Sequence, residues 1–152
     1  AAMAASRQID EGLRRAEGVE RLSQRAGAEA KSDAQRDADA AEILAALHGR
    51  ASREPSEDLS DLTTQYGYLG ESAYRWVLGE IWARSELSLR DRSLVTLTIV
   101  ICLGGGSMLT QTLKDSFNAG LTQQEVEEML AHLGLYAGLV RATAAMDCLR
   151  EL

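Results

Sequence analysis

The spacing of apolar positions predicts that the N-terminal part of the chain is largely helical. Over residues 7–25, large apolar side chains recur at intervals of three and four, which is the pattern of one face of an amphipathic helix. Residues 26–39 are polar and nearly repetitive, so we expect a frayed helix or a linker there. Over residues 40–48 a small apolar stripe predicts that helical order resumes.

Pro55, which is the only proline, indicates a boundary between an N-terminal helical arm and a body. We therefore divide the chain into residues 1–55 and residues 56–152. The body begins with two predicted helices, at 57–67 and 71–84. These two segments have too many apolar positions for exposed surface helices, so we expect both to be well buried.

Two helix starts in the body are marked by capping sequences. Ser88 is followed three residues later by Asp91, and Thr122 is followed in the same way by Glu125. In such a capping box the hydroxyl accepts a hydrogen bond from the amide of the third helical residue, and the acidic side chain accepts one in return. Both positions therefore predict a helix N-terminus.

The apolar run over residues 94–103 could form a buried strand or a buried helix, because its β-branched content allows either. The cap upstream and the lack of a partner strand favour a helix that ends at Gly104–Gly106. Further helices are expected from Ser107 to the turn at Asn118–Gly120, and from 125 to 152 with a break near Gly138.

Composition is typical of one ordinary soluble domain, since 45% of the 152 residues are hydrophobic and 26% are charged. The net charge of −7 supplies no basic field for phosphates, so we expect no nucleic-acid partner. The longest apolar run is about half the length of a membrane span, so we expect no membrane association. The N-terminus shows no apolar secretory segment, which predicts a cytoplasmic protein.

Cysteine and histidine are too sparse to indicate a metal site. Cys102 and Cys148 lie in separate apolar stretches, where we expect small buried thiols. His48 and His132 are the only histidines, which argues against a zinc site with several ligands. We therefore predict no metal.

Four blocks of the body resemble the carboxymuconolactone decarboxylase family, whose relatives include the alkylhydroperoxidase D proteins. The resemblance covers about residues 74–152 and rests on the order and spacing of the blocks. They are Gly79-Glu80-Ile81-Trp82-Ala83-Arg84, Arg90-Asp91-Arg92-Ser93-Leu94-Val95-Thr96-Leu97, Phe117-Asn118-Ala119-Gly120-Leu121-Thr122, and His132 followed by Tyr136-Ala137-Gly138. The resemblance implies an all-α, alkylhydroperoxidase D-like helical bundle that forms a homo-oligomer, commonly a trimer or hexamer.

The chain departs from the family pattern on one helix. The decarboxylases have a Leu-His-Leu-Arg-like stretch whose histidine is thought to serve the chemistry, and here Thr112 stands at the histidine position. A threonine hydroxyl cannot exchange protons near neutral pH as an imidazole can. The peroxidase relatives have a Cys-x-x-Cys pair on this helix, whereas residues 107–114 contain no cysteine. We therefore expect no thiol peroxidase activity.

Glu80 and His132 are the predicted acid/base groups. Glu80 lies between two tryptophans, where burial would raise its pKa toward the range of a general acid or base. The structural alternative is an exposed ion pair with Arg84, four residues further along the helix. His132 is the only imidazole of the body, and its alternative is a core histidine with satisfied hydrogen bonds.

Four further residues are predicted to bind the substrate. Arg92 lies in the first turn of a helix, where an arginine gains nothing from the helix dipole, and is therefore expected to bind a carboxylate. Its alternative partner is Glu80 or an acid of a neighbouring subunit. Gln111 and Thr112 could orient a carbonyl group, and Tyr136 could close the same pocket or simply pack.

These residues lead to two hypotheses. The first is an acid/base enzyme without a cofactor that acts on a small carbonyl or lactone acid, as a decarboxylase, isomerase or cyclase. The second is a non-catalytic oligomeric scaffold whose N-terminal arm binds a partner helix. The enzyme hypothesis predicts that Glu80, Arg92, Thr112 and His132 line one cavity.

Overall fold

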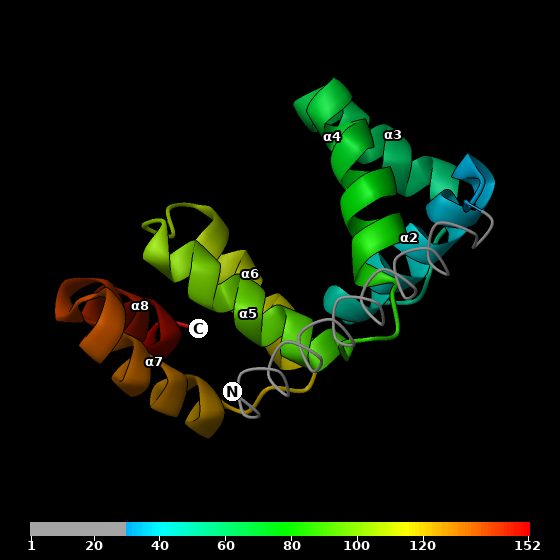
Figure 1. Cartoon of the computed structure of the whole chain (residues 1–152). Coiled ribbons are helices and arrows are strands. Elements are labelled where there is room, and N and C mark those ends of the chain that lie inside the picture. Colours follow the sequence, from blue (N-terminus) through cyan, green and yellow to red (C-terminus); the bar gives the residue numbers. More distant parts are fainter. Residues whose placement is uncertain (1–29) are drawn as a thin grey trace, which may run out of the picture. The chain divides into compact units, whose positions relative to one another are not determined.

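The structure, a computed structural model, describes residues 30–152, and within this range all regular elements are helices (Figure 1). The predicted all-α fold is thus confirmed. Residues 33–152 form one compact unit, which begins upstream of the boundary predicted at Pro55. The predicted helix over 7–25 lies outside the described residues. No described helix has the length and apolar character needed to cross a membrane.

Helix α2 (Asp33–Leu47) begins inside the segment predicted to be a frayed helix or a linker. It is ordered there because its polar residues have partners on the later helix η1 (Ala73–Trp82). Asp37 accepts a 2.8 Å hydrogen bond from Nε of Arg75, and its backbone carbonyl accepts one from the Tyr74 hydroxyl at 3.0 Å. Ala40 and Ala41 are buried, so their small side chains allow close packing. Tertiary contacts thus override the polar composition of this segment.

The predicted helix over 57–67 is α3 (Pro55–Tyr66), with proline in its first turn. The predicted helix over 71–84 is divided into the short α4 (Tyr68–Ser72) and η1, which is a π-helix. The expectation that these segments are well buried is wrong for the single chain, because Trp76 and Ile81 on η1 are about half exposed.

Helices α5 (Leu89–Cys102), α6 (Met108–Asn118), α7 (Gln123–Ala137) and α8 (Leu139–Arg150) follow. In Figure 1, α5 lies against α6 and α7 lies against α8. The apolar run over 94–103 is therefore helical. The core of these helices is formed by Leu97, Ile101, Leu113, Leu121, Val126, Leu130, Leu133, Ala142, Ala145 and Leu149.

Local signals determine where these helices begin and end. The Ser88 hydroxyl caps α5 by accepting the amide of Asp91 at 3.1 Å, and Thr122 and Glu125 form a complete capping box on α7. Gly138 has φ of 101°, a left-handed conformation that favours glycine, and it separates α7 from α8. The predicted caps and the predicted break are thus confirmed.

Candidate active site

A cavity of about 240 Å³ lies between α2, η1, α5 and α6, and we call it the α6 cavity. Its walls are mostly apolar, and its polar residues come from α5 and α6. The lining residues are Leu44, Leu47, Val77, Leu78, Trp82, Ser93, Thr96, Met108, Thr112, Asp115 and Ser116. This combination of apolar walls and a few convergent polar groups is typical of a small-molecule site.

The π-helical form of η1 shapes one wall of this cavity. Hydrogen bonds in a π-helix join residues five apart, and π-helical turns are frequent at functional sites. Val77 and Trp82, which are five residues apart, both line the α6 cavity. The 3.6-residue spacing used to analyse the sequence could not predict this shared face.

Asp115 is the ionisable residue that lines the α6 cavity. Burial raises the pKa of the Asp115 carboxyl, while a hydrogen bond from Gln111 and the charge of His48 partly oppose the shift. The Gln111 Nε2 atom donates this bond to Oδ1 at 2.7 Å. Asp115 therefore has the character of a carboxyl group that could exchange a proton with a bound ligand.

Four hydroxyl side chains line the α6 cavity, and three of them, Ser93, Thr112 and Ser116, differ in their hydrogen bonds. Thr112 donates to the carbonyl of Met108 at 2.8 Å, and Ser116 donates to the carbonyl of Thr112 at 2.7 Å. Ser93 is 2% exposed, yet its Oγ has no hydrogen-bond partner among the described residues. The Ser93 hydroxyl is therefore the one of these three whose proton is not committed to the backbone.

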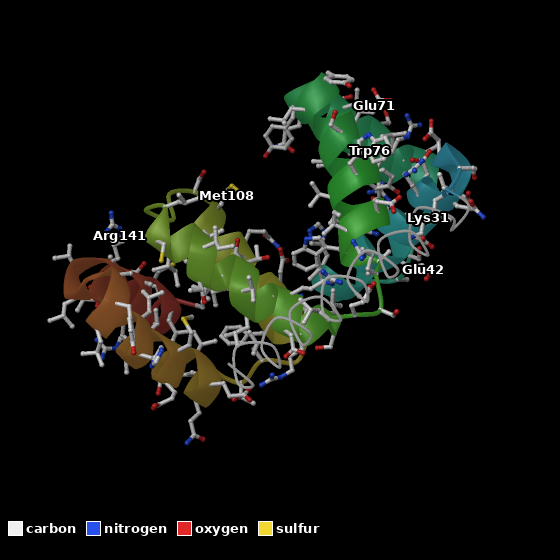
Figure 2. The ribbon with its side chains drawn as sticks, viewed as in Figure 1. Lys31, Glu42, Glu71, Trp76, Met108 and Arg141 are labelled. Carbon is white, nitrogen blue, oxygen red and sulfur yellow. The ribbon has the colours of Figure 1, made fainter. Side chains whose placement is uncertain are left out.

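Glu80 lies at the interface of α2 and η1 and is not among the residues that line the α6 cavity. Its Oε2 accepts a 2.9 Å hydrogen bond from Nε of Arg36, a residue that is itself buried. The guanidinium carbon of Arg36 lies 4.2 Å from the ring centre of Trp76, which is labelled in Figure 2. Arg84 instead pairs with Glu86 at 3.0 Å. Glu80 thus has an ion-pair partner, but not the one predicted.

Arg92 lies beside the loop before α5. Its Nη2 donates to the carbonyl of Arg84 at 2.9 Å, and its buried Nε has no partner among the described side chains and backbone groups. Arg92 does not line the α6 cavity, although it precedes Ser93. No carboxylate within the described part of the chain is paired with it in the structure.

His132 and Tyr136 lie on α7, with ring centres 4.8 Å apart. They line a second cavity of about 270 Å³, the α7 cavity, together with Thr98, Cys102, Met129, Leu133 and Ala137. His132 is exposed in the single chain rather than buried in the core. Cys102 and Cys148 are free and half-buried.

The prediction that Glu80, Arg92, Thr112 and His132 line one cavity is wrong for the single chain, because the structure brings together only some of the predicted site residues. Thr112 lines the α6 cavity and Gln111 bonds to Asp115 there, whereas His132 and Tyr136 line the α7 cavity. Ser93 and Asp115 were not predicted. Asp115 follows Thr112 by three residues, which places both on one face of a helix, so its position could have been found. No group of three His, Cys, Asp or Glu residues within 30–152 is placed to hold a metal ion.

Comparison with known proteins identifies the family. The sequence profile of the carboxymuconolactone decarboxylase family matches residues 71–151, which is more than half of the chain. The chain belongs to this family. The match begins just before η1 and extends to the end of α8, so it includes Thr112, Asp115 and Ser93.

Two curated relatives share this region. The chain is 40% identical over 78 residues to a 4-carboxymuconolactone decarboxylase of Acinetobacter baylyi, covering 51% of this chain and 58% of the relative. It is 31% identical over 71 residues to a nitrosuccinic acid decarboxylase of Metarhizium robertsii, covering 47% of this chain and 50% of the relative. The chain thus spans about half the length of the curated relatives it matches.

Proposed function

We propose that this protein is a decarboxylase-like lyase, without a cofactor, that acts on a small carboxylic acid bound in the α6 cavity. The observation that carries the proposal is the position of Thr112. By the family resemblance this residue stands at the place of the family histidine, and it lines a cavity that also contains Asp115. Both curated relatives are named as decarboxylases of small acids, which supports this reaction class.

The walls of the α6 cavity suit the loss of CO₂. A carboxylate in an apolar site loses its hydration, and this cost falls as its charge spreads in the transition state. When the bond between the carboxylate and its carbon breaks, the electron pair passes to that carbon and is stabilised by a neighbouring electron-withdrawing group. Asp115 then supplies the proton that completes the product, and water returns a proton to Asp115.

The acid/base roles predicted for Glu80 and His132, and the substrate-binding roles predicted for Arg92, Gln111, Thr112 and Tyr136, remain predictions. In this proposal Thr112 and Gln111 act at the α6 cavity, where Gln111 orients Asp115. Glu80 supports the cavity through its bond to Arg36, which joins α2 to η1.

The proposal is tested by CO₂ release from a panel of small acids with a lactone, keto or nitro group next to the carboxylate. We expect at least one acid to lose CO₂, and Asp115→Asn to reduce the rate by about 10²–10⁴-fold, the range for lost acid/base catalysis. The matched control is Asp147→Asn, because Asp147 is an exposed carboxylate on α8. An unchanged rate in Asp115→Asn would refute the assigned role.

An isomerase or cyclase could use the same proton donor without releasing CO₂. Product analysis of the same reactions separates these activities, since an isomer keeps the mass of the substrate. A chain that neither binds nor converts any of these acids would instead support the scaffold hypothesis.

A further inference from the structure

Ser93 is a buried hydroxyl whose hydrogen-bonding capacity is not used by the protein. It is 2% exposed, lines the α6 cavity, and its Oγ has no partner among the described residues. An unpartnered hydroxyl in the interior costs stability, so buried polar groups without a partner in a native structure call for an explanation.

Other hydroxyl side chains within helices make a hydrogen bond that Ser93 lacks. Thr98, Thr112 and Ser116 each donate to the carbonyl four residues earlier, at 2.7–2.8 Å. Such a back-bond is the usual solution for a serine or threonine inside a helix. Ser93 lies in the second turn of α5 and does not make this bond. Its hydroxyl proton therefore has no acceptor among the described residues.

The residues that line the α6 cavity indicate which kind of ligand atom would accept a hydrogen bond from Ser93. Among the described residues that line it, none is Lys, Arg or His, and the ionisable one is Asp115. The ligand's carboxylate loses its hydration anywhere in this cavity, and a charged oxygen held at Ser93 would have no cation among the lining residues to offset that cost. An uncharged carbonyl oxygen would accept the same hydrogen bond without that cost.

We propose that Ser93 donates a hydrogen bond to an uncharged carbonyl oxygen, of a ketone or lactone, on the ligand of the α6 cavity. This inference deepens the proposed function and rests on the α6 cavity as the substrate site. It assigns the ligand's carbonyl end to the α5 wall. During CO₂ loss this oxygen gains negative charge, so the Ser93 hydrogen bond would strengthen in the transition state.

The test uses two unreactive probes, cyclopentanone and cyclopentane, which share a ring and differ in the carbonyl group. Binding to the full chain is followed by amide NMR shifts of α5 and α6. We expect Ser93→Ala to weaken cyclopentanone binding about fivefold, the effect of one hydrogen bond, and to leave cyclopentane binding unchanged. Ser116→Ala is the matched control, because Ser116 is a buried serine of the same cavity with its proton committed.

Thermal unfolding provides a second measurement on the same variants. Ser93→Ala removes an unpartnered hydroxyl, so its Tm is expected to equal or exceed that of the native chain. Ser116→Ala loses its bond to the Thr112 carbonyl, so its Tm is expected to fall. A lower Tm in Ser93→Ala would show that the hydroxyl has a structural partner and would overturn the inference.

The outcomes separate this inference from the proposed function. If cyclopentanone fails to bind the native chain, or binds Ser93→Ala and the native chain equally well, the Ser93 hydrogen bond is refuted. If Ser93 governs cyclopentanone binding but no acid releases CO₂, the inference stands and the decarboxylase proposal fails.

Discussion

Asp115 is the carboxyl group on which the proposed chemistry depends. Burial raises the pKa of Asp115 above its usual value of 3.8. At a pH between the usual and the raised pKa, the folded state therefore binds more protons than the unfolded state. The free energy of unfolding therefore decreases as the pH rises through this window. Activity is also expected to decrease as the pH rises through the raised pKa, because the proton donor Asp115 then loses its proton.

Asp115→Asn is expected to have a higher Tm than the native chain at pH 7, because the buried charge is gone and the amide oxygen still accepts from Gln111. The difference in Tm should disappear below pH 3.8, where the carboxyl is protonated in both states. Calorimetry across this pH range measures it, with Asp147→Asn as the exposed control. A Tm difference that does not change with pH would contradict the assigned titration.

Glu80→Gln tests a residue for which the sequence and the structure favour different roles. The substitution removes the charge that faces the buried Arg36 guanidinium, so we expect a loss of about 1–3 kcal/mol in the free energy of unfolding. Denaturant unfolding measures this loss. We expect kcat of the folded variant to be nearly unchanged. A rate loss of about 10²–10⁴-fold with unchanged stability would instead establish the acid/base role predicted from the sequence.

The two cavity residues that were not predicted differ in how they could have been found. Asp115 shares a helix face with Thr112, and the family pattern already marked Thr112, so spacing alone was enough. Ser93 belongs to one of the four blocks that resemble the family, but nothing in the sequence shows that its hydroxyl lacks a hydrogen-bond partner. Its unpartnered state arises only from packing between α5 and the elements around it.

At the scale of elements, Gly79 determines how closely α2 packs against η1. A Cβ atom at Gly79 would lie 2.2 Å from the backbone carbonyl oxygen of Arg36, a distance that no side chain can relieve by moving. Gly79→Ala is therefore expected to reduce the free energy of unfolding by at least about 1–3 kcal/mol, the typical cost of overpacking. Denaturant unfolding measures this effect.

Gly134→Ala is the matched control on α7. Its Cβ atom would lie 3.1 Å from the end of the Leu139 side chain, which can adjust, and 3.4 Å from the Ala142 Cβ, which is an ordinary contact distance. Alanine also favours a helix by about 1 kcal/mol over glycine, so we expect a much smaller change. Equal losses in the two variants would contradict the close approach of η1 to α2.

Helices α5 to α8 could be predicted closely because local chemistry determines their ends. Capping hydroxyls begin α5 and α7, and Gly138 ends α7. The start of α2 could not be predicted, because its order depends on partners on η1 about 38 residues later. The π-helical form of η1 was also missed, since an apolar pattern analysed with a period of 3.6 assumes an α-helix.

For the whole molecule, large apolar side chains at the α7–α8 corner and the α5–α6 turn are exposed in the single chain. Leu103 and Val140 are each 83% exposed, and Leu135 and Tyr136 are about 80% exposed. Clusters of this kind mark interaction surfaces. We expect a homo-oligomer, as the family resemblance implied, and sedimentation of the native chain should show more than one copy.

Leu135→Glu combined with Val140→Glu should shift this oligomer toward the monomer, because charges would be desolvated in the interface. Both side chains are exposed in the single chain, so the helical circular dichroism signal should remain. Glu128→Gln, at an exposed residue of α7, is the control. A native chain that sediments as a monomer would contradict the prediction.

The central claim is that the reaction takes place in the α6 cavity, at the position of Thr112. The most direct test is CO₂ release from 4-carboxymuconolactone by the native chain and by Thr112→His, which restores an imidazole on α6. We predict slow release by the native chain and an increase of about 10²-fold or more in the folded variant, the effect of one acid/base group. Equal rates in the two proteins, or rapid release by the native chain, would contradict the account.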